Sequence, residues 1–396
     1  MTLPSKILSP RAFRLRLGLG VLVLNLFVVL MTVVSLRQSW RNHQDLALAS
    51  VRNLAQVLDR YAADTFSKAD LAIWAVKDEL ERSAGKKADP AALEAFLHRQ
   101  QGRAPGLLAL RVTDARGVVV LGGGEGGTPV SLADREHFIR LRDDPSAGLV
   151  VSRPLVGKLT GTWVIILARR LEDANHGFAG MVHAVIELDQ FTRAFSSLDV
   201  GPHGSVALRG EDLGLIARYP LAPQPGAAIG QKVVSPEFAA FVQSGRSAGT
   251  YNTRTPFDQV QRTFAIRRVS DWPFYVVVGL AHQDYLAGWW REAIQQSAEV
   301  GLFACLTLVA TWLIYRGWLR QRASHEHLER LLAEVKTLGG MLPICSHCKK
   351  IRDDKGYWNQ LEAYLNEHTE AEFTHGICPD CAQEVFPRAS GKHSTL

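Results

Sequence analysis

Two stretches without charged residues dominate the hydropathy pattern of the chain. Leu17 to Leu36 is a run of 20 residues, and Val300 to Tyr315 is a run of 16. A helix that crosses the bilayer core needs about 20 apolar residues. The first run is therefore long enough, and the second becomes so when its flanks are included. The pattern predicts two transmembrane helices, at residues 17–36 and 298–318.

Basic residues beside the spans predict their orientation. Only Arg291 lies shortly before the second apolar run, which ends at Tyr315, whereas four arginines follow that run, and cytoplasmic flanks are enriched in arginine and lysine. Both termini, including residues 1–16, are therefore expected in the cytoplasm. A cleaved signal peptide is the alternative for the first run, but its candidate cleavage site at 47–49 follows a hydrophobic stretch that is already too long. The four arginines are Arg316, Arg320, Arg322 and Arg330.

Between the spans, residues 39–287 form one outward-facing domain with two kinds of periodicity. Apolar residues recur at steps of three and four for about 40 residues after Arg41, which predicts one long helix. After a short helix from Ala91 the period changes to two, with glycine and aspartate turns between strand-like runs. The fold class is therefore α+β, with two subdomains in series on the long helix. The runs are LLALRVTD, VVVLGG, LVVSRPLV, TWVIILARRL and GMVHAVIEL around the helix DREHFIRLRD, and, after a helical connection at 189–198, SVALRG, LGLIARYP, GTYNTR, VQRTFAIRRV and FYVVVGLA around the helix SPEFAAFVQ.

The order of these motifs resembles a known family. LRVTDARGVVV, DREHF, VVSRPLV, LTGTWVIILARRL and GFAGMVHAVIELDQF, followed by LGLIARYP and WPFYVVVGL, are similar to a double Cache domain, or PDC sensor, of the type attached to diguanylate cyclases. The resemblance covers about residues 39–287. It implies two PAS-like subdomains, with the ligand held in the membrane-distal one and the domain in the bacterial periplasm, beyond the inner membrane.

The helix and strands of the first subdomain concentrate side chains that suit a small anion. Guanidinium forks beside an aromatic surface bind carboxylates well. For any single arginine, a solvated face or a pair with Asp143, Asp144 or Glu172 is the alternative. Asp134 is also expected to cap the helix that follows it. The candidate ligand-binding residues are Asp134, Arg135, His137, Phe138, Arg140, Ser152, Arg153, Trp163 and Arg169.

The resemblance also bears on the kind of ligand. Double Cache sensors of amino acids carry a tyrosine and an aspartate on one strand pair and another aspartate on the last strand. Leu155, Gly157 and Val185 appear in the corresponding places of this sequence. An α-amino group would lack its counter-charges there, so the sequence disfavours an amino acid and favours an organic anion.

Residues 319–340 have a short heptad-like pattern. Leu328, Leu331, Val335 and Leu338 recur at three, four and three, with charged residues between them. Two heptads are too short to be stable alone, but they can continue a membrane helix into a parallel dimer. A single amphipathic linker helix is the alternative.

Four of the five cysteines lie in the last 52 residues, as two CxxC pairs separated by 29 residues. Zn²⁺ favours four tetrahedral thiolates, so this spacing predicts a structural zinc site. His347 and His375 are possible substitute ligands. Cytoplasmic thiols are kept reduced, which argues against permanent disulfides. The predicted ligands are Cys345, Cys348, Cys378 and Cys381.

The module around these cysteines, residues 341–388, carries five basic and eight acidic residues. A net-acidic module is a poor nucleic-acid binder, so a protein partner is expected. The chain's net charge of +6 does not change this, because much of it flanks the spans. The string LPICSHCKKIRDDKGYWNQLEAYLNEHTEAEFTHGICPDCA resembles a zinc-ribbon-like cassette found at the ends of bacterial sensor and response-regulator proteins.

No enzyme domain is visible in the sequence. A composition of 47% hydrophobic and 21% charged residues excludes a disordered chain. About 80 residues follow the second span, and they lack kinase glycine motifs and a GGDEF sequence. The sequence predicts a homodimeric receptor that passes an outside signal to a separate kinase or cyclase. A membrane-anchored thiol or zinc redox sensor, and a scaffold that binds no ligand, are the alternatives.

Overall fold

The structure is a computed structural model that describes residues 9–83, 89–123, 130–221, 226, 228–334, 342–369 and 371–385. It divides into two compact units. One unit joins residues 1–26 with 302–396, and the other is formed by residues 27–301. The second unit contains all but two of the strands that the structure describes and is the part that carries the predicted sensor.

The first helix, α1 (Pro10–Ser83), is one unbroken helix of 74 residues. The predicted first span and the predicted long helix are therefore parts of the same element. From Ala47 onward one stripe of α1 is buried, with mostly small residues alternating with larger apolar ones. The spacing of three and four keeps these residues on one face. The stripe comprises Ala47, Val51, Ala55, Leu58, Asp59, Ala62, Thr65, Phe66, Ala69, Ala72, Ile73 and Val76.

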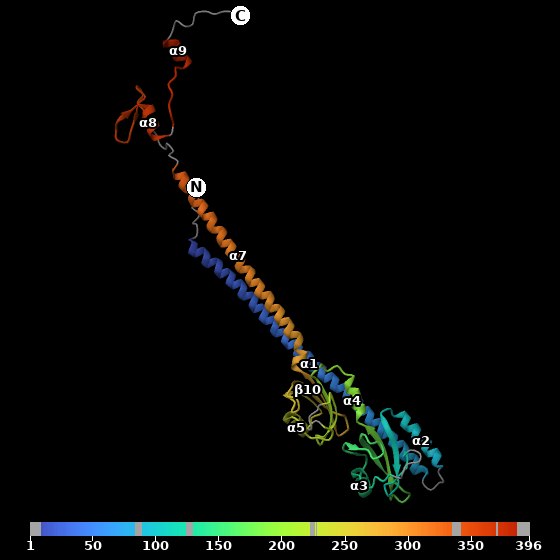
Figure 1. Ribbon diagram of the computed structural model, residues 1–396. Coiled ribbons are helices and arrows are strands. Elements are labelled where there is room, and N and C mark those ends of the chain that lie inside the picture. The colour runs from blue at the N-terminus through green and yellow to red at the C-terminus, as the bar shows by residue number, and fades with distance from the viewer. Residues whose placement is uncertain are drawn as a thin grey trace, which may run out of the picture. The chain divides into compact units, whose positions relative to one another are not determined.

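The first sheet of the sensor is antiparallel and has the order β2-β1-β6-β5-β3, with β4 also paired to β5. Helix α3 (Glu136–Asp143) lies on one of its faces, and α1 with α2 (Pro90–Arg103) lies on the other (Figure 1). The strands are β1 (Leu107–Thr113), β2 (Val119–Leu121), β3 (Val150–Val151), β4 (Leu155–Val156), β5 (Trp163–Glu172) and β6 (Phe178–Glu187).

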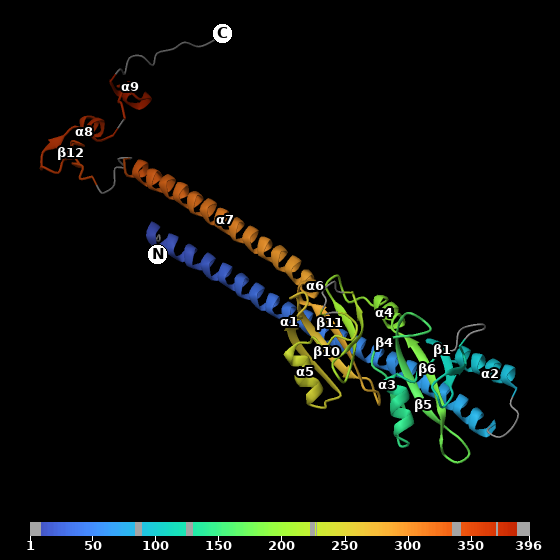
Figure 2. The same ribbon diagram turned by 60° about the horizontal axis from the view of Figure 1, so that its bottom comes forward.

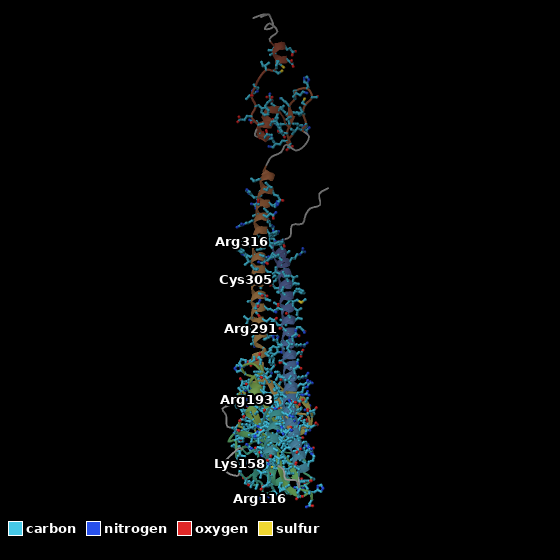
Figure 3. The ribbon with its side chains drawn as sticks, turned by 90° about the vertical axis from the view of Figure 1, so that its right-hand side faces the viewer. Arg116, Lys158, Arg193, Arg291, Cys305 and Arg316 are labelled. Carbon is cyan, nitrogen blue, oxygen red and sulfur yellow. The ribbon has the colours of Figure 1, made fainter. Side chains whose placement is uncertain are left out.

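The second sheet follows the connecting helix α4 (Asp189–Ser196) and has the antiparallel order β8-β7-β11-β10-β9. Helix α5 (Pro236–Gln243) covers one face, as Figure 2 shows beside β10, and α1 covers the other. Figure 3 labels Arg193 in α4, and Lys158 and Arg116 in the region of the first sheet. The strands are β7 (Ser205–Gly210), β8 (Leu215–Tyr219), β9 (Ala248–Arg254), β10 (Gln261–Arg268) and β11 (Phe274–Ala281). The expected α+β class with two PAS-like subdomains on a long helix is confirmed.

A single hydrophobic core joins the two sheets through α1. Phe66 is fully buried, and its ring centroid lies 5.6 Å from that of Phe191, 5.3 Å from Trp272 and 4.6 Å from Phe274. Val112 and Ile165 of the first sheet belong to the same cluster. The sheets therefore share one supporting helix rather than packing as independent domains.

One ion pair ties α1 to each sheet. Arg169 in β5 donates to both carboxylate oxygens of Asp70, at 2.7 and 2.9 Å, and its guanidinium lies 4.5 Å from the Trp74 ring centre. Arg267 in β10 donates through Nε to Asp59 at 3.1 Å. Both aspartates project from α1, so each sheet has a charged contact as well as an apolar one with the helix.

The last strand of the second sheet leads directly to the second apolar helix. After α6 (His282–Tyr285), α7 (Ala287–Glu334) continues for 48 residues. Within the described part of the chain, α1 and α7 are the helices long and apolar enough to cross a membrane, and the apolar segment of each contains no buried residue. Figure 3 labels Arg291, Cys305 and Arg316 along α7.

Side-chain contacts hold α1 and α7 together within each unit. In the sensor unit, the indole N–H of Trp289 donates to the Leu36 carbonyl at 3.0 Å, and Ser39 hydrogen-bonds Glu292. In the other unit, Asn25 donates to the Thr307 hydroxyl at 3.0 Å.

The linker predicted at 319–340 is helical as far as Glu334. Leu328 and Leu331 are exposed in this single chain, as a dimer seam would be before pairing. Val335 and Leu338 lie outside the described residues, so the predicted coiled coil stays a prediction.

Replacing Phe66 by alanine is expected to destabilise the sensor by about 3–5 kcal/mol, because the ring fills the shared core and leaves a cavity when it is removed. Urea unfolding followed by tryptophan fluorescence measures this loss. Leu71→Ala on the same helix is the matched control, since Leu71 is 68% exposed. Its effect should stay within about 0.5 kcal/mol. Equal losses in the two variants would contradict a core centred on α1.

Candidate functional site

A buried polar layer lies between the first sheet and α3. Strand alternation sends Arg111, His183 and Ala168 to the same face, because His183 is paired with Arg111 in β1 and with Ala168 in β5. From α3, His137 and Phe138 point toward this face and are buried. Apolar side chains surround the two histidines, including Ile166, Met181 and Val185.

Three of the four imidazole nitrogens in this layer lack partners among the described residues. Both ring nitrogens of His137 and Nδ1 of His183 are buried without a hydrogen bond to any described residue. A buried polar nitrogen without a partner costs about 1–3 kcal/mol. This arrangement is the kind that a bound polar molecule would satisfy.

Burial and nearby positive charge keep both imidazoles neutral. Burial, reinforced by Arg135, lowers the pKa of His137 to about 4. Burial, reinforced by His137 and Arg111, holds the pKa of His183 well below its usual value. Each ring therefore carries one N–H donor and one acceptor nitrogen near neutral pH.

The side chains before α3 connect the helix to β4 and the loop after it. Arg135 donates to the Val156 carbonyl at 3.2 Å, and Lys158 lies 2.6 Å from the Asp134 carboxylate. Lys158, first among several contacts, holds the pKa of Asp134 below its usual range. Asp134 does not cap α3 as expected, because Arg135 occupies the N-cap position and no side chain caps there.

The cysteine module contains the short hairpin β12 (Ile351–Arg352) and β13 (Trp358–Asn359), with α8 (Leu361–His368) and α9 (Pro379–Val385). The backbone N–H of Cys348 donates to the Cys345 sulfur at 3.5 Å, and Lys349 adopts a positive φ of 58°. The N–H groups of Cys348 and His347 lower the pKa of the Cys345 thiol. N–H groups directed at sulfur favour the thiolate, which is the form that binds zinc.

Cys378 and Cys381 form a second pair at the start of α9, where the Cys381 N–H lowers the pKa of the Cys378 thiol. The four donors fit zinc in kind. Over the described residues, however, the structure does not gather three or more histidine, cysteine or acidic groups in one place. The zinc site stays a prediction.

Comparison with known proteins shows which domains the sensor region is similar to. A family model described as a dCache_1-like histidine kinase sensor domain matches residues 188–279. The crystal structure of the extracellular domain of the candidate histidine kinase rpHK1S-Z16 is 25% identical, with a TM-score of 0.53, and the match covers 62% of this chain and 99% of that one. The sensor region is a Cache-type domain.

Two chemoreceptor domains match this chain with lower TM-scores than the histidine kinase domain does. The ligand-binding domain of Campylobacter jejuni Tlp3, solved with 4-methylisoleucine, is 11% identical with a TM-score of 0.47, covering 61% of this chain and 93% of that one. That of the Pseudomonas aeruginosa PAO1 amino acid chemoreceptor PctB, solved with L-Arg, is 14% identical with a TM-score of 0.46, covering 61% and 97%. No curated protein matches the chain.

The expected double Cache resemblance is thereby confirmed for the sensor. Together with two helices that are long and apolar enough to cross a membrane, the Cache domain supports a membrane protein whose sensor lies outside the cytoplasm.

The Cache domain brings together only part of the predicted ligand set. His137 and Phe138 lie on the buried side of α3, and Arg135 lies at the start of that helix. Ser152 is used within the protein, since its hydroxyl accepts from the Ile166 N–H at 2.9 Å. The remaining side chains on this side, those of Asp134, Arg140, Arg153 and Trp163, are exposed.

The prediction that Arg169 lies with the other candidate ligand-binding residues, on the α3 side of the first sheet, is wrong. In β5, Ile166 and Ala168 face α3, so the neighbouring odd-numbered residues face α1, where Arg169 binds Asp70. Arg170 occupies the α3 side instead and donates to the Leu141 carbonyl at 2.8 Å.

Arg111 and His183 were missed as candidate residues. Both are polar side chains within runs that otherwise read as apolar strand, LLALRVT and GMVHAVIEL. A histidine at an inward position of such a run was the available signal.

Acid is expected to weaken the Cache domain between pH 6.5 and 4. His137 has a pKa of about 4 in the folded protein against 6.5 for an ordinary histidine. Within this window the unfolded chain binds more protons, so stability falls as the pH falls. The loss reaches about 3 kcal/mol near pH 4, and His183 adds to it in the same direction.

Urea unfolding across this pH range measures the effect. His137→Phe should lose less stability on acidification, whereas His98→Gln, at an exposed position, should behave as the parent protein does. An unchanged acid response in His137→Phe would show that His137 is not the buried group responsible.

Proposed function

We propose that this chain is a two-pass bacterial inner-membrane receptor whose Cache domain binds a small organic anion in the periplasm. The unpartnered nitrogens of His137 and His183, beside Arg111, are the observation that carries this proposal. An anion at this place would accept from the guanidinium and from the imidazole N–H groups, and so would repay the cost of burying them.

The charges around this layer favour an anion. Arg111 and Arg135 act on the two histidines, and the Asp134 carboxylate is already occupied by Lys158. Val185 is a buried apolar residue on this face, so it offers no counter-charge to an ammonium group. We therefore propose an organic acid rather than an amino acid.

The proposed signal path runs through the helices. The second sheet ends at β11, and only α6 and one residue separate β11 from α7. Both termini would lie in the cytoplasm, and the chain would act as a homodimer through residues 319–340. Ligand binding can shift the helices only by the difference in its affinity for their two arrangements.

The proposed output is a docking surface for a separate kinase or cyclase, formed by the module at 341–388. Zn²⁺ held by Cys345, Cys348, Cys378 and Cys381 would supply folding energy that a module of this size lacks. We propose no enzymatic activity and no nucleic-acid binding for the chain.

A second candidate function is a thiol switch in the same module. The Cys348 N–H that donates to the Cys345 sulfur at 3.5 Å favours it, because this contact stabilises the thiolate, which is the oxidisable form of cysteine.

The ligand proposal is tested by thermal unfolding of the full-length protein in nanodiscs with a panel of carboxylates, amines and purines. At least one carboxylate should raise the midpoint. Arg111→Met should reduce that rise by removing a guanidinium from the buried layer. Arg140→Met, at an exposed position of α3, is the matched control and should keep it. A panel in which no compound raises the midpoint would remove the receptor proposal.

The metal proposal predicts one Zn²⁺ per chain in the purified protein, measured by atomic emission. Cys345→Ser and Cys378→Ser should each lower this content, because a tetrahedral site loses a ligand. Cys305→Ser is the matched control, since Cys305 lies in the apolar part of α7, outside the module. Peroxide separates the two candidate functions: unchanged zinc and thiol contents afterwards would eliminate the redox switch.

A further inference from the structure

The second sheet has a cavity of its own, on the face covered by α5. Its volume is about 50 Å³. Two arginines, Arg209 and Arg218, line it together with the hydroxyl side chains of Ser235, Tyr251 and Thr253. It is separate from the polar layer under α3, which belongs to the first sheet.

Arg209 is buried in this wall without an acidic partner among the described residues. It is 6% exposed, and it donates to backbone carbonyl oxygens, at 2.7 Å to Leu213 and at 3.1 Å to Val233. These carbonyls orient the guanidinium but do not neutralise it. Burial and the neighbouring Arg218 lower the pKa of Arg209 to about 10.

Arg218 shares a single carboxylate with a third arginine. Its Nη2 lies 3.8 Å from Asp258, whereas Arg262 binds both oxygens of Asp258 at 2.9 and 2.8 Å. Glu237, exposed on α5, interacts with the hydroxyls of Thr253 and Ser235. Around the cavity, three guanidinium groups therefore stand against two carboxylates among the described residues.

Aromatic rings hold the two arginines that line the cavity. The Arg218 guanidinium lies 5.0 Å from the Phe257 ring centre, and that of Arg209 lies 6.0 Å from Phe238. Cation–π contacts of this kind fix the position of a guanidinium and do not cancel its charge. Two neighbouring buried cations repel each other, and an anion between them would relieve that repulsion.

We propose that this cavity is a second ligand site, for a small carboxylate of two or three carbons. The arginines would bind the carboxylate, the hydroxyl of Tyr251 would donate to it, and the apolar wall would face its short carbon chain. This site would act independently of the layer around His137 and His183.

Titration calorimetry on the full-length protein in nanodiscs tests the site, with acetate, propionate and inorganic phosphate as the probes. Arg111→Met serves as the background, because it impairs the first site. Propionate or acetate should still bind this variant, and the further change Arg218→Met should weaken the binding at least tenfold. Circular dichroism checks that each variant is folded.

Tyr251→Phe is the milder companion variant, since it removes only a hydroxyl. It should weaken propionate binding several-fold in the same background. Carboxylate binding that is lost with Arg111→Met alone, or retained in full after both Arg218→Met and Tyr251→Phe, would overturn the second site. Binding of phosphate without acetate or propionate would overturn its assignment to carboxylates. If the first site does not bind a ligand, carboxylate binding at the second site can still be measured, because the background variant already lacks Arg111.

Discussion

The buried stripe of α1 is the contact on which both halves of the sensor depend. One helix face supplies the apolar surface that each sheet needs on its inner side, and Phe66 lies where the two sheets and α4 meet. Neither sheet could move along α1 without uncovering part of this stripe. Exposing apolar surface costs roughly 25 cal/mol per Å², so even a small displacement of a sheet would lower the free energy of unfolding. The helix therefore fixes the spacing of the sheets.

The same arrangement explains why both candidate sites lie away from α1. Each sheet uses one face for the shared core, and the other face is closed by a helix of its own, α3 or α5. Polar side chains gather on those outer faces, as His183 does in β6 and Arg209 in β7. Their strand neighbours, such as Val182 and Ala184, belong to the core on α1. A ligand on an outer face is thus one strand layer from the supporting helix.

Most of the fold could be predicted because period and turn residues mark it clearly. The run TWVIILARRL at 162–171 corresponds to β5 at Trp163–Glu172, a displacement of one residue. The site was harder, because a single residue of strand phase decides which face a side chain takes. Arg169 and Arg170 differ only in that phase, and nothing in their side chains distinguishes them before the sheet is assembled. Asp134 was misplaced for a related reason, since α3 begins one residue later than expected and Arg135 takes the N-cap position.

The two ion pairs that α1 makes with the sheets differ in their number of hydrogen bonds. Asp70 and Arg169 form a two-bond pair beside Trp74, whereas Asp59 receives one bond from Arg267, and its other oxygen has no partner among the described residues. Bidentate pairs are the stronger and more directional ones. The charged contact of the first sheet with α1 is therefore the stronger of the two. Since the second sheet continues through α6 into α7, a shift at the weaker contact would displace α7 against α1 at the Trp289 and Glu292 contacts. The second sheet is thus the part of the sensor that continues directly into the second long helix.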